Sequence, residues 1–346
     1  MRIKRLTLPL LRGAALAGLT AACAVVSASE VNLYTTREPG LIQPLLNEFT
    51  NDSGIKVNTV FVKDGLLERV KAEGDKSPAD ILMTVDIGNL IDLVHGGITQ
   101  PVKSEVLEEV IPANLRDPGN QWYALSLRDR VAYVAKDLDV QELTYESLAD
   151  PRWKGKVCTR SGQHPYNTAL IAAMIAHNGP EAAEEWLRGL KANLGRKATG
   201  GDRDVARDIL GGICDIGIAN AYYVGRMKNA EPGSDAYKWG EAIKVIRPVF
   251  ASSDSKGTHV NVSGAAFAKY APNKDNALKL MEYLVSEKAQ SMYANANYEY
   301  PVRKGVTLDP VVASFGELVI DPLPLTKIAE QRKLASELVD KVGFDN

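Results

Sequence analysis

Short apolar runs rich in β-branched and aromatic residues alternate with segments whose apolar residues recur every three or four positions. Runs of the first kind occur at 31–36, 55–62 and 80–85, and segments of the second kind lie between them at 41–50 and 66–72. The first pattern is typical of strands and the second of helices. Strand, helix, strand, helix, strand in this order predicts a parallel α/β unit.

A second α/β unit is predicted after the charged segment Arg128-Asp129-Arg130, which separates two expected strands at 122–127 and 131–134. Beyond it, the same patterns predict strands at 156–159, 213–219 and 244–250, and an extended return segment at 258–268. Helices are predicted at 168–177, 180–191, 204–210, 276–285, 287–294 and 325–342.

The first 28 residues have the composition of a secretory signal peptide. Three of the first five residues are basic, residues 13–26 form a short apolar run, and small residues precede Ala28. We therefore expect cleavage after about Ala28. Arg12 leaves the apolar run too short for a membrane anchor, so the mature protein is not expected to be embedded in the membrane. Cys23 leaves lipidation as an alternative, although Thr20 stands where a lipobox usually has Leu.

Two similar α/β units joined by extended crossings, in an exported chain, predict a two-lobed venus-flytrap architecture. Each lobe is expected to hold a mostly parallel sheet flanked by helices. We assign residues 29–127 and 263–304 to the N-lobe, and residues 128–262 and 305–346 to the C-lobe.

Composition narrows the function. The 346 residues carry a net charge of −2, with 45% hydrophobic and 24% charged residues, which fits a globular protein large enough for two lobes. The only basic block lies near the N-terminus, so nucleic acid is not an expected partner. The histidines, His95, His164, His177 and His259, have no metal-hydrolase spacing, and the chain lacks a nucleophile elbow, a Walker loop and a dinucleotide fingerprint. We therefore expect a binding protein and not an enzyme.

The mature chain would keep two cysteines, Cys158 and Cys214. An even pair in an exported chain predicts a disulfide. Each cysteine precedes a tyrosine by eight residues, Tyr166 in one case and Tyr222 in the other. A bridge would therefore tie two neighbouring strands whose following loops carry phenols. Two buried free thiols are the alternative.

Adjacent phenols at Tyr222 and Tyr223 follow directly after the predicted strand at 213–219 and Asn220. In a continuing strand they would point to opposite faces, but at a strand-to-helix turn both can point beyond the end of the strand. That is where open α/β sheets bind ligands. Oxygen donors suit a hard, highly charged cation, and such a cation can displace the phenolic proton. Two aromatic side chains packing beneath a helix are the alternative.

Several short stretches together resemble the periplasmic ferric-ion-binding proteins of bacterial iron ABC importers, a branch of the type II solute-binding fold. The resemblance covers nearly the whole mature chain and is specific only when the stretches are taken together. They are Val31-Asn32-Leu33-Tyr34, Ser77-Pro78-Ala79-Asp80-Ile81-Leu82, Gly155-Lys156-Val157-Cys158, Asn220-Ala221-Tyr222-Tyr223, Gly257-Thr258-His259-Val260-Asn261-Val262-Ser263-Gly264 and Tyr298-Glu299-Tyr300-Pro301-Val302.

The resemblance implies a ligand set. The family's adjacent tyrosines fall on Tyr222 and Tyr223, its third C-lobe tyrosine falls on Tyr166, and an arginine for a synergistic anion falls on Arg130. Many members have a further Tyr or His-Tyr in the first loop, where this chain has Arg37-Glu38-Pro39-Gly40. One phenol is therefore missing, and Glu38 is a weak candidate to replace it.

The expected function is extracytoplasmic binding of Fe³⁺, with carbonate or another anion completing the metal's ligands. As the resemblance implies, a periplasmic monomer would deliver the iron to an ABC permease and its ATPase. Three phenolates would balance the charge of Fe³⁺, and Arg130 would hold the anion through charge-assisted hydrogen bonds. The alternative is an ABC-importer binding protein for a phosphonate, thiamine, a polyamine or an iron chelate.

Overall fold

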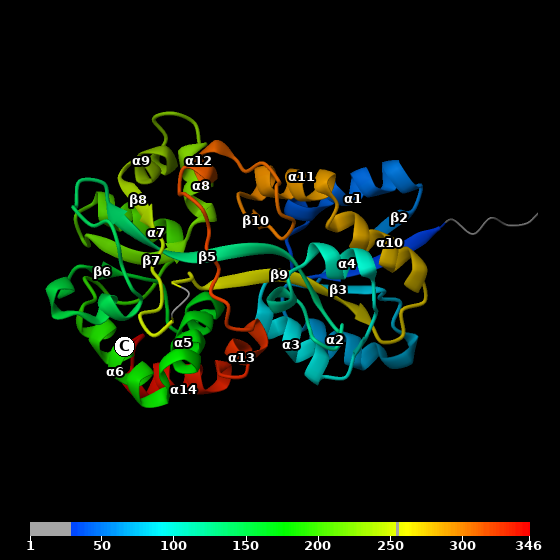
Figure 1. Cartoon of the computed structure of the whole chain (residues 1–346), viewed down its shortest axis with the longest axis horizontal. Coiled ribbons are helices and arrows are strands. Elements are labelled where there is room, and N and C mark those ends of the chain that lie inside the picture. The colour runs from blue at the N-terminus through cyan, green and yellow to red at the C-terminus, as the bar shows by residue number, and fades with distance from the viewer. Residues whose placement is uncertain (1–28, 254–255) are drawn as a thin grey trace, which may run out of the picture.

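The computed structural model describes residues 29–253 and 256–346, so the predicted signal peptide and Cys23 lie outside the described residues. Figure 1 shows two groups of helices and strands joined by long strands that run between them. The strands are β1 (Glu30–Thr35), β2 (Lys56–Phe61), β3 (Ile81–Thr84), β4 (Thr99–Gln100), β5 (Tyr123–Ala135), β6 (Val157–Cys158), β7 (Ile216–Asn220), β8 (Ile243–Ile246), β9 (Val260–Ala268) and β10 (Tyr300–Pro301).

The α-helices that precede β5 in the chain are α1 (Pro39–Ser53), α2 (Leu66–Glu73), α3 (Ile87–His95) and α4 (Glu105–Val110). Those of the second group are α5 (Pro165–Asn178), α6 (Pro180–Ala192), α7 (Asp202–Leu210), α8 (Tyr222–Lys228) and α9 (Asp235–Glu241). The chain then forms α10 (Lys274–Leu284), α11 (Glu287–Asn297), α12 (Pro310–Ala313), α13 (Leu325–Ala329) and α14 (Arg332–Val342).

Local sequence explains where the elements near the cleft begin and end. Helix α1 starts with Pro39, whose missing N–H costs nothing in the first turn, and it ends at Gly54 with φ 71°. Helix α3 starts after Asp86, whose carboxylate accepts a hydrogen bond from the Asn89 backbone N–H. All four residues of β3 are buried, as its continuous apolar run predicts.

The sheet order β2-β1-β3-β9-β5-β7-β6 confirms the α/β class but corrects the expectation of mostly parallel lobes. Strands β1, β2 and β3 are parallel to one another, and β6 is parallel to β7. The crossing strands β5 and β9 pair antiparallel with each other and with β7 and β3. The chain crosses between the groups in one direction and returns in the other, so each half of the sheet is mixed.

The charged segment at 128–130 does not interrupt a strand. Strand β5 is continuous, and its first part pairs with β9 while the part from Arg130 onward pairs with β7. Charged residues remain in a buried strand because each has a partner: Asp129 pairs with Arg247 at 2.9 Å, and Arg130 pairs with Asp202 at 2.6 Å. Two strands were predicted because the sequence does not show these partners.

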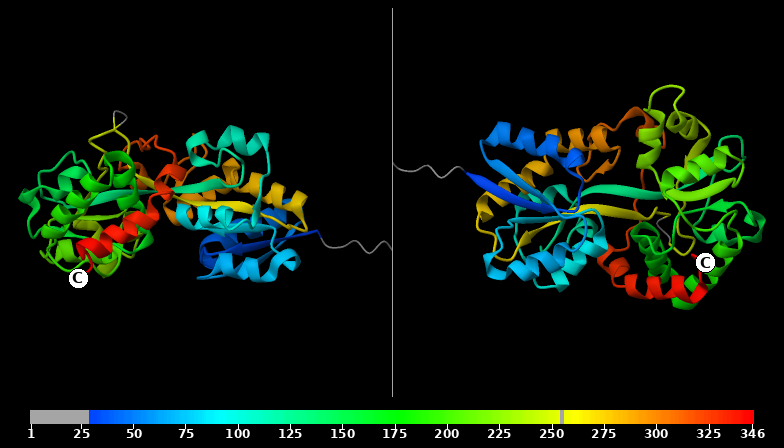
Figure 2. Two further views of the ribbon diagram at one scale, coloured as in Figure 1. Left: turned by 90° about the horizontal axis from the view of Figure 1, so that it is seen from below. Right: turned by 180° about the vertical axis from the view of Figure 1, so that it is seen from behind.

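Of the boundaries predicted between the two lobes, those at 127/128 and 262/263 fall inside β5 and β9, and that at 304/305 falls after β10. The residue assignment of the lobes stays a prediction. The C-terminal helices join the two groups, because α13 packs against both α3 and α5, and α14 packs against α5 and α6. Figure 2 shows this C-terminal segment along one side of the molecule. Within the described residues, no helix combines the length and the apolar character needed to cross a bilayer.

Candidate functional site

A cleft of about 220 Å³ lies where the two groups of elements face each other. Its walls come from the loop after β1, the end of β3, the middle of β5, the start of α5, helix α8 and the residue before β10. The lining residues are Thr36, Arg37, Glu38, Leu41, Val85, Arg128, Tyr166, Tyr222, Tyr223, Arg226 and Glu299. The cleft therefore gathers all three predicted tyrosines and Glu38, whereas Arg130 is not among its lining residues.

The adjacent tyrosines occupy the first turn of α8, directly after β7. Strand β7 is buried throughout and ends at Asn220, and Ala221 separates it from the helix. The rings of Tyr222 and Tyr223 lie with their centroids 4.1 Å apart at an interplanar angle of 31°. Both rings line the cleft, as a strand-to-helix turn allows and a continuing strand would not.

Tyr166 lies in the first turn of α5 and not in the loop that the sequence pattern predicts. His164 caps this helix, because its Nδ1 accepts a hydrogen bond from the Tyr166 backbone N–H at 3.2 Å, and Pro165 occupies the first helical position. The Pro-Tyr-Asn sequence therefore starts the helix three residues earlier than its apolar spacing suggests. Three guanidinium groups lie over the Tyr166 ring, those of Arg160, Arg128 and Arg130, at 5.1, 5.4 and 5.9 Å.

Burial raises the pKa of both Tyr222 and Tyr223, and the neighbouring Tyr166 raises each further. The phenols of α8 therefore hold their protons at neutral pH when no cation is bound. A hard cation would have to displace these protons. Phenolates formed in this way would stand beside Arg128 and Arg226, which supply positive charge at the cleft wall.

Arg128 is a buried arginine that lines the cleft beside the tyrosines, with 3% of its surface exposed. Its Nη1 donates to the Tyr166 hydroxyl at 3.3 Å. Its Nη2 donates to the carbonyl of Val262 at 3.1 Å and to the carbonyl of Val85. These bonds fix the guanidinium between strands while one edge of it remains at the cleft.

Arg130 lies behind the tyrosines. It is 2% exposed, and it donates to Asp202 and Asn167 at 2.6 Å each and to Asn220 at 3.0 Å. Asp202 also accepts from the Asn220 backbone N–H at 2.8 Å and from Arg160 at 3.3 Å. This network connects the middle of β5 and the end of β7 with the start of α7, and it fixes the turn that carries Tyr222.

The wall opposite the tyrosines is built around Arg37 and Glu299. The Arg37 Nη2 donates to the two carboxylate oxygens of Glu299 at 2.7 and 2.8 Å and to Ser263 at 3.2 Å. Glu299 also accepts from the Ser126 hydroxyl at 2.5 Å. Glu38 is exposed next to this pair, at the start of α1, and its side chain does not cap that helix.

Four cleft residues with charge were not predicted as site residues: Arg37, Arg128, Arg226 and Glu299. Arg128 lies two residues before Arg130 on the same strand, so both side chains lie on one face and only the position along β5 separates them. Arg37 is adjacent to Glu38 in the first loop. The only sequence signal for Arg128 was the Arg-x-Arg pair itself, which does not show which arginine reaches the cleft.

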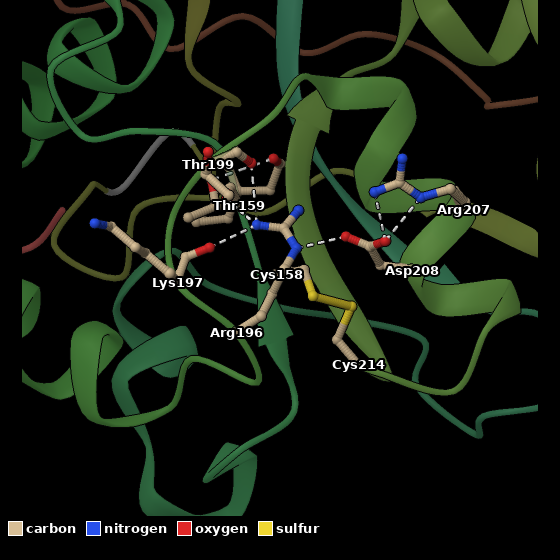
Figure 3. Close-up of a disulfide and its surroundings, with 9 residues drawn as sticks. Cys158, Thr159, Arg196, Lys197, Thr199, Arg207, Asp208 and Cys214 are labelled. Atoms are coloured by element: carbon tan, nitrogen blue, oxygen red, sulfur yellow. Dashed lines mark hydrogen bonds and ion pairs between the residues drawn. A yellow bond between two sulfur atoms is a disulfide. The ribbon is translucent and has the colours of Figure 1, made fainter. Parts of the chain in front are cut away.

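The predicted disulfide between Cys158 and Cys214 is present, with Cα atoms 5.9 Å apart. It joins the end of β6 to the residue two positions before β7, and these two strands are parallel neighbours. Figure 3 shows the bridge beside Arg196, whose guanidinium pairs with Asp208 of α7. The bridge thus lies at the opposite end of β7 from Tyr222.

Within residues 29–253 and 256–346, no three His, Cys, Asp or Glu side chains gather in a way that could hold a metal ion. The oxygen-bearing side chains that line the cleft include the phenols of Tyr166, Tyr222 and Tyr223 and the carboxylate of Glu38.

Two groups of α/β elements, joined by crossing strands and enclosing a polar cleft, define a solute-binding protein of the venus-flytrap class. Residues 76–314 match the family described as bacterial extracellular solute-binding protein, and the chain belongs to this family. The predicted fold class and family are thereby confirmed.

Relatives with high similarity are named for iron. Iron uptake protein A1 of Synechocystis sp. is 41% identical over 91% of this chain and 87% of its own length. The solved structure of a Bordetella ferric binding protein is 75% identical, with a TM-score of 0.89 over 92% of this chain and 100% of that chain. A Trichodesmium protein solved with iron and citrate is 39% identical, with a TM-score of 0.86 over 91% of this chain and 100% of that chain.

Proposed function

We propose that this protein binds ferric iron outside the cytoplasm, in the periplasm, and delivers it to an ABC permease and its ATPase. The observation that carries this proposal is the convergence of three phenols, from Tyr166, Tyr222 and Tyr223, on one cleft. Relatives named for iron uptake and ferric iron binding support it. Membership in a family of solute-binding proteins supports the role of delivery.

In the proposed site, Fe³⁺ replaces the three phenolic protons, so three protons are released. The ion and its three phenolates together carry no net charge. Because iron takes more than three ligands, the remaining positions are open to carbonate, water or another anion. We assign the anion to Arg128, whose guanidinium lies at the cleft and beside Tyr166, and not to Arg130, whose donors are directed to Asp202, Asn167 and Asn220.

Glu38 is the candidate for a further ligand from the first loop. It lines the same cleft and is exposed, and its side chain makes no hydrogen bond to the start of α1. A movement of the lobes would therefore bring its carboxylate to the metal without breaking a capping bond. The other charged residues on that wall, Arg37 and Glu299, form an ion pair with each other at 2.7 Å, and we assign this pair a structural role.

The test is a titration of the purified, iron-free protein with ferric citrate, followed by visible absorption. A ferric–phenolate site absorbs visible light through charge transfer from phenolate to iron, and we expect a saturating band at one iron per protein. A protein that stays colourless, yet binds a phosphonate, thiamine or a polyamine in calorimetry, would contradict the proposal and favour the organic-solute alternative.

A further inference from the structure

The short segment Tyr298-Glu299-Tyr300 leads from the end of α11 into β10 and contacts three parts of the molecule, and the proposed function uses none of its tyrosines. We propose that Tyr298 is a positioning residue for the iron-binding phenols. Its ring, held against Gly225 of α8, sets how far Tyr222 and Tyr223 lie from the opposite wall of the cleft. This inference rests on the proposed function for its link to iron.

The contact between Tyr298 and Gly225 leaves no room for a side chain on the helix. A Cβ atom at Gly225 would lie 2.6 Å from Cγ of Tyr298 and 2.7 Å from its Cβ and Cδ1. These atoms form the base of the ring, so Tyr298 cannot avoid the clash by a small rotation of its far end. Gly225 is buried and follows Tyr222 by three residues, about one helical turn.

The backbone of Tyr298 adopts a conformation that disfavours tyrosine. Its φ is 60°, and it forms the left-handed end of α11, with its N–H donated to the carbonyl of Ala294 at 2.9 Å. Glycine is the usual residue at such a helix end because it has no Cβ to clash. The local backbone therefore does not account for a tyrosine here, and the contact of its ring with Gly225 does.

Both neighbours of Tyr298 are anchored. Glu299 binds Arg37 at 2.7 Å and Ser126 at 2.5 Å, which fixes the segment to the first loop and to β5. The ring of Tyr300 lies 5.3 Å from the guanidinium of Arg247, and its hydroxyl accepts a hydrogen bond from the same side chain. Because these neighbours are fixed, Tyr298 limits how closely α8 can approach at Gly225.

The two contacting elements belong to different groups of the fold. Helix α11 packs against α1 and α10, and α8 packs against α9 and α12. Figure 1 shows α11 and α8 on either side of the region where β5 passes between the groups. The contact therefore sets the position of the phenol-bearing helix relative to the wall that carries Arg37 and Glu299.

The experiment compares four variants of the full-length mature protein. Gly225→Ala adds the clashing atom, and Tyr298→Gly removes the ring while suiting the positive φ. Tyr298→Phe keeps the ring and is the rescue variant. The matched control is Gly189→Ala in α6, where the added Cβ would meet Cβ of Ala149 at 2.8 Å, away from the cleft.

We expect Gly225→Ala and Tyr298→Gly to lose iron to a competing chelator faster than the wild type, by about tenfold or more. Their phenolate-to-iron absorption band should also shift. Tyr298→Phe should match the wild type in both measurements. Gly189→Ala should lower the thermal midpoint but leave the band and the rate of iron loss unchanged. Iron loss and a band equal to those of the wild type in Gly225→Ala and Tyr298→Gly would overturn the inference.

A measurement without iron separates this inference from the proposed function. Spin labels on Lys103→Cys and Lys154→Cys, both exposed positions, report the distance between the two groups of elements by pulsed electron resonance. Gly225→Ala should lengthen or broaden this distance in the iron-free protein, and Gly189→Ala should not. If the wild type never forms the band, the proposed function fails, while an unchanged distance in Gly225→Ala would refute the contact itself.

Discussion

At the scale of single residues, Arg128 and Arg130 have opposite surroundings although one residue separates them. Arg130 is paired with the buried carboxylate of Asp202, whereas Arg128 donates hydrogen bonds to two carbonyls and to the Tyr166 hydroxyl. Removing one member of a buried ion pair leaves the other charge uncompensated and costs about 3–5 kcal/mol. Changing Arg130 to alanine should therefore affect mainly the stability of the fold, whereas changing Arg128 should affect mainly the retention of iron.

Arg130→Ala is expected to lower the free energy of unfolding by about 3 kcal/mol, since Arg160 still offers Asp202 a partial partner. Arg128→Ala should instead speed iron loss in the presence of carbonate, by about tenfold, because the anion loses its cation. Urea unfolding and iron transfer to a chelator measure these effects, and Glu38→Ala is compared with them because Glu38 is the candidate ligand from the first loop. Fast iron loss in Glu38→Ala, together with normal retention in Arg128→Ala, would assign the missing contact to the first loop.

At the scale of elements, the disulfide joins β6 and β7 at the end remote from the tyrosines. The bridged cysteines are 56 residues apart, and closing a loop of this length restricts the unfolded chain. We expect Cys158→Ser with Cys214→Ser to lower the free energy of unfolding by about 2–4 kcal/mol. The visible band should stay as it is, because the bridge does not touch the cleft. A band lost in the folded double variant would show that the bridge shapes the site directly.

The apolar pattern predicts the first α/β unit to within a few residues, because β1 to β3 and the helices between them follow local propensity. It fails at β5 and at Tyr166 for two different reasons, one distant in sequence and one local. Buried charge in β5 depends on Asp202 and Arg247, far away in sequence, and the early start of α5 depends on capping by His164. The tyrosine pair was predictable because a strand-to-helix turn is a local feature. The sequence could not show that Arg128, and not Arg130, lines the cleft, because both lie on one face of the same strand.

At the scale of the whole molecule, the return crossing begins beside a buried histidine. His259 is 1% exposed, and neither ring nitrogen has a hydrogen-bond partner. Burial lowers the pKa of His259 to about 4, although Asp321 opposes this shift. The folded state thus favours neutral imidazole, while the unfolded chain takes up the proton near its ordinary pKa of about 6.5. The folded protein therefore loses stability as pH falls from about 6.5 towards 4.

Between pH 7 and pH 5, His259 should therefore cost the iron-free protein about 2 kcal/mol of unfolding free energy, at about 1.4 kcal/mol per pH unit below the unfolded pKa. Between the same two pH values, the free energy of unfolding of His259→Leu should fall by about 2 kcal/mol less than that of the wild type. Urea unfolding at both pH values gives the comparison. His164, whose pKa burial also lowers to about 4, keeps part of the acid sensitivity in the variant. Equal losses in the variant and the wild type would contradict this role for His259.

The central claim is that Tyr166, Tyr222 and Tyr223 hold ferric iron as phenolates. Resonance Raman spectroscopy of the iron-loaded protein, excited within the visible band, tests it most directly, because only tyrosine ring modes coupled to iron are enhanced. We predict enhanced tyrosinate modes in the wild type and their loss in the triple variant Tyr166→Phe, Tyr222→Phe, Tyr223→Phe, which should still fold. Iron bound without enhanced tyrosinate modes in the wild type, or the same modes in the triple variant, would contradict the claim.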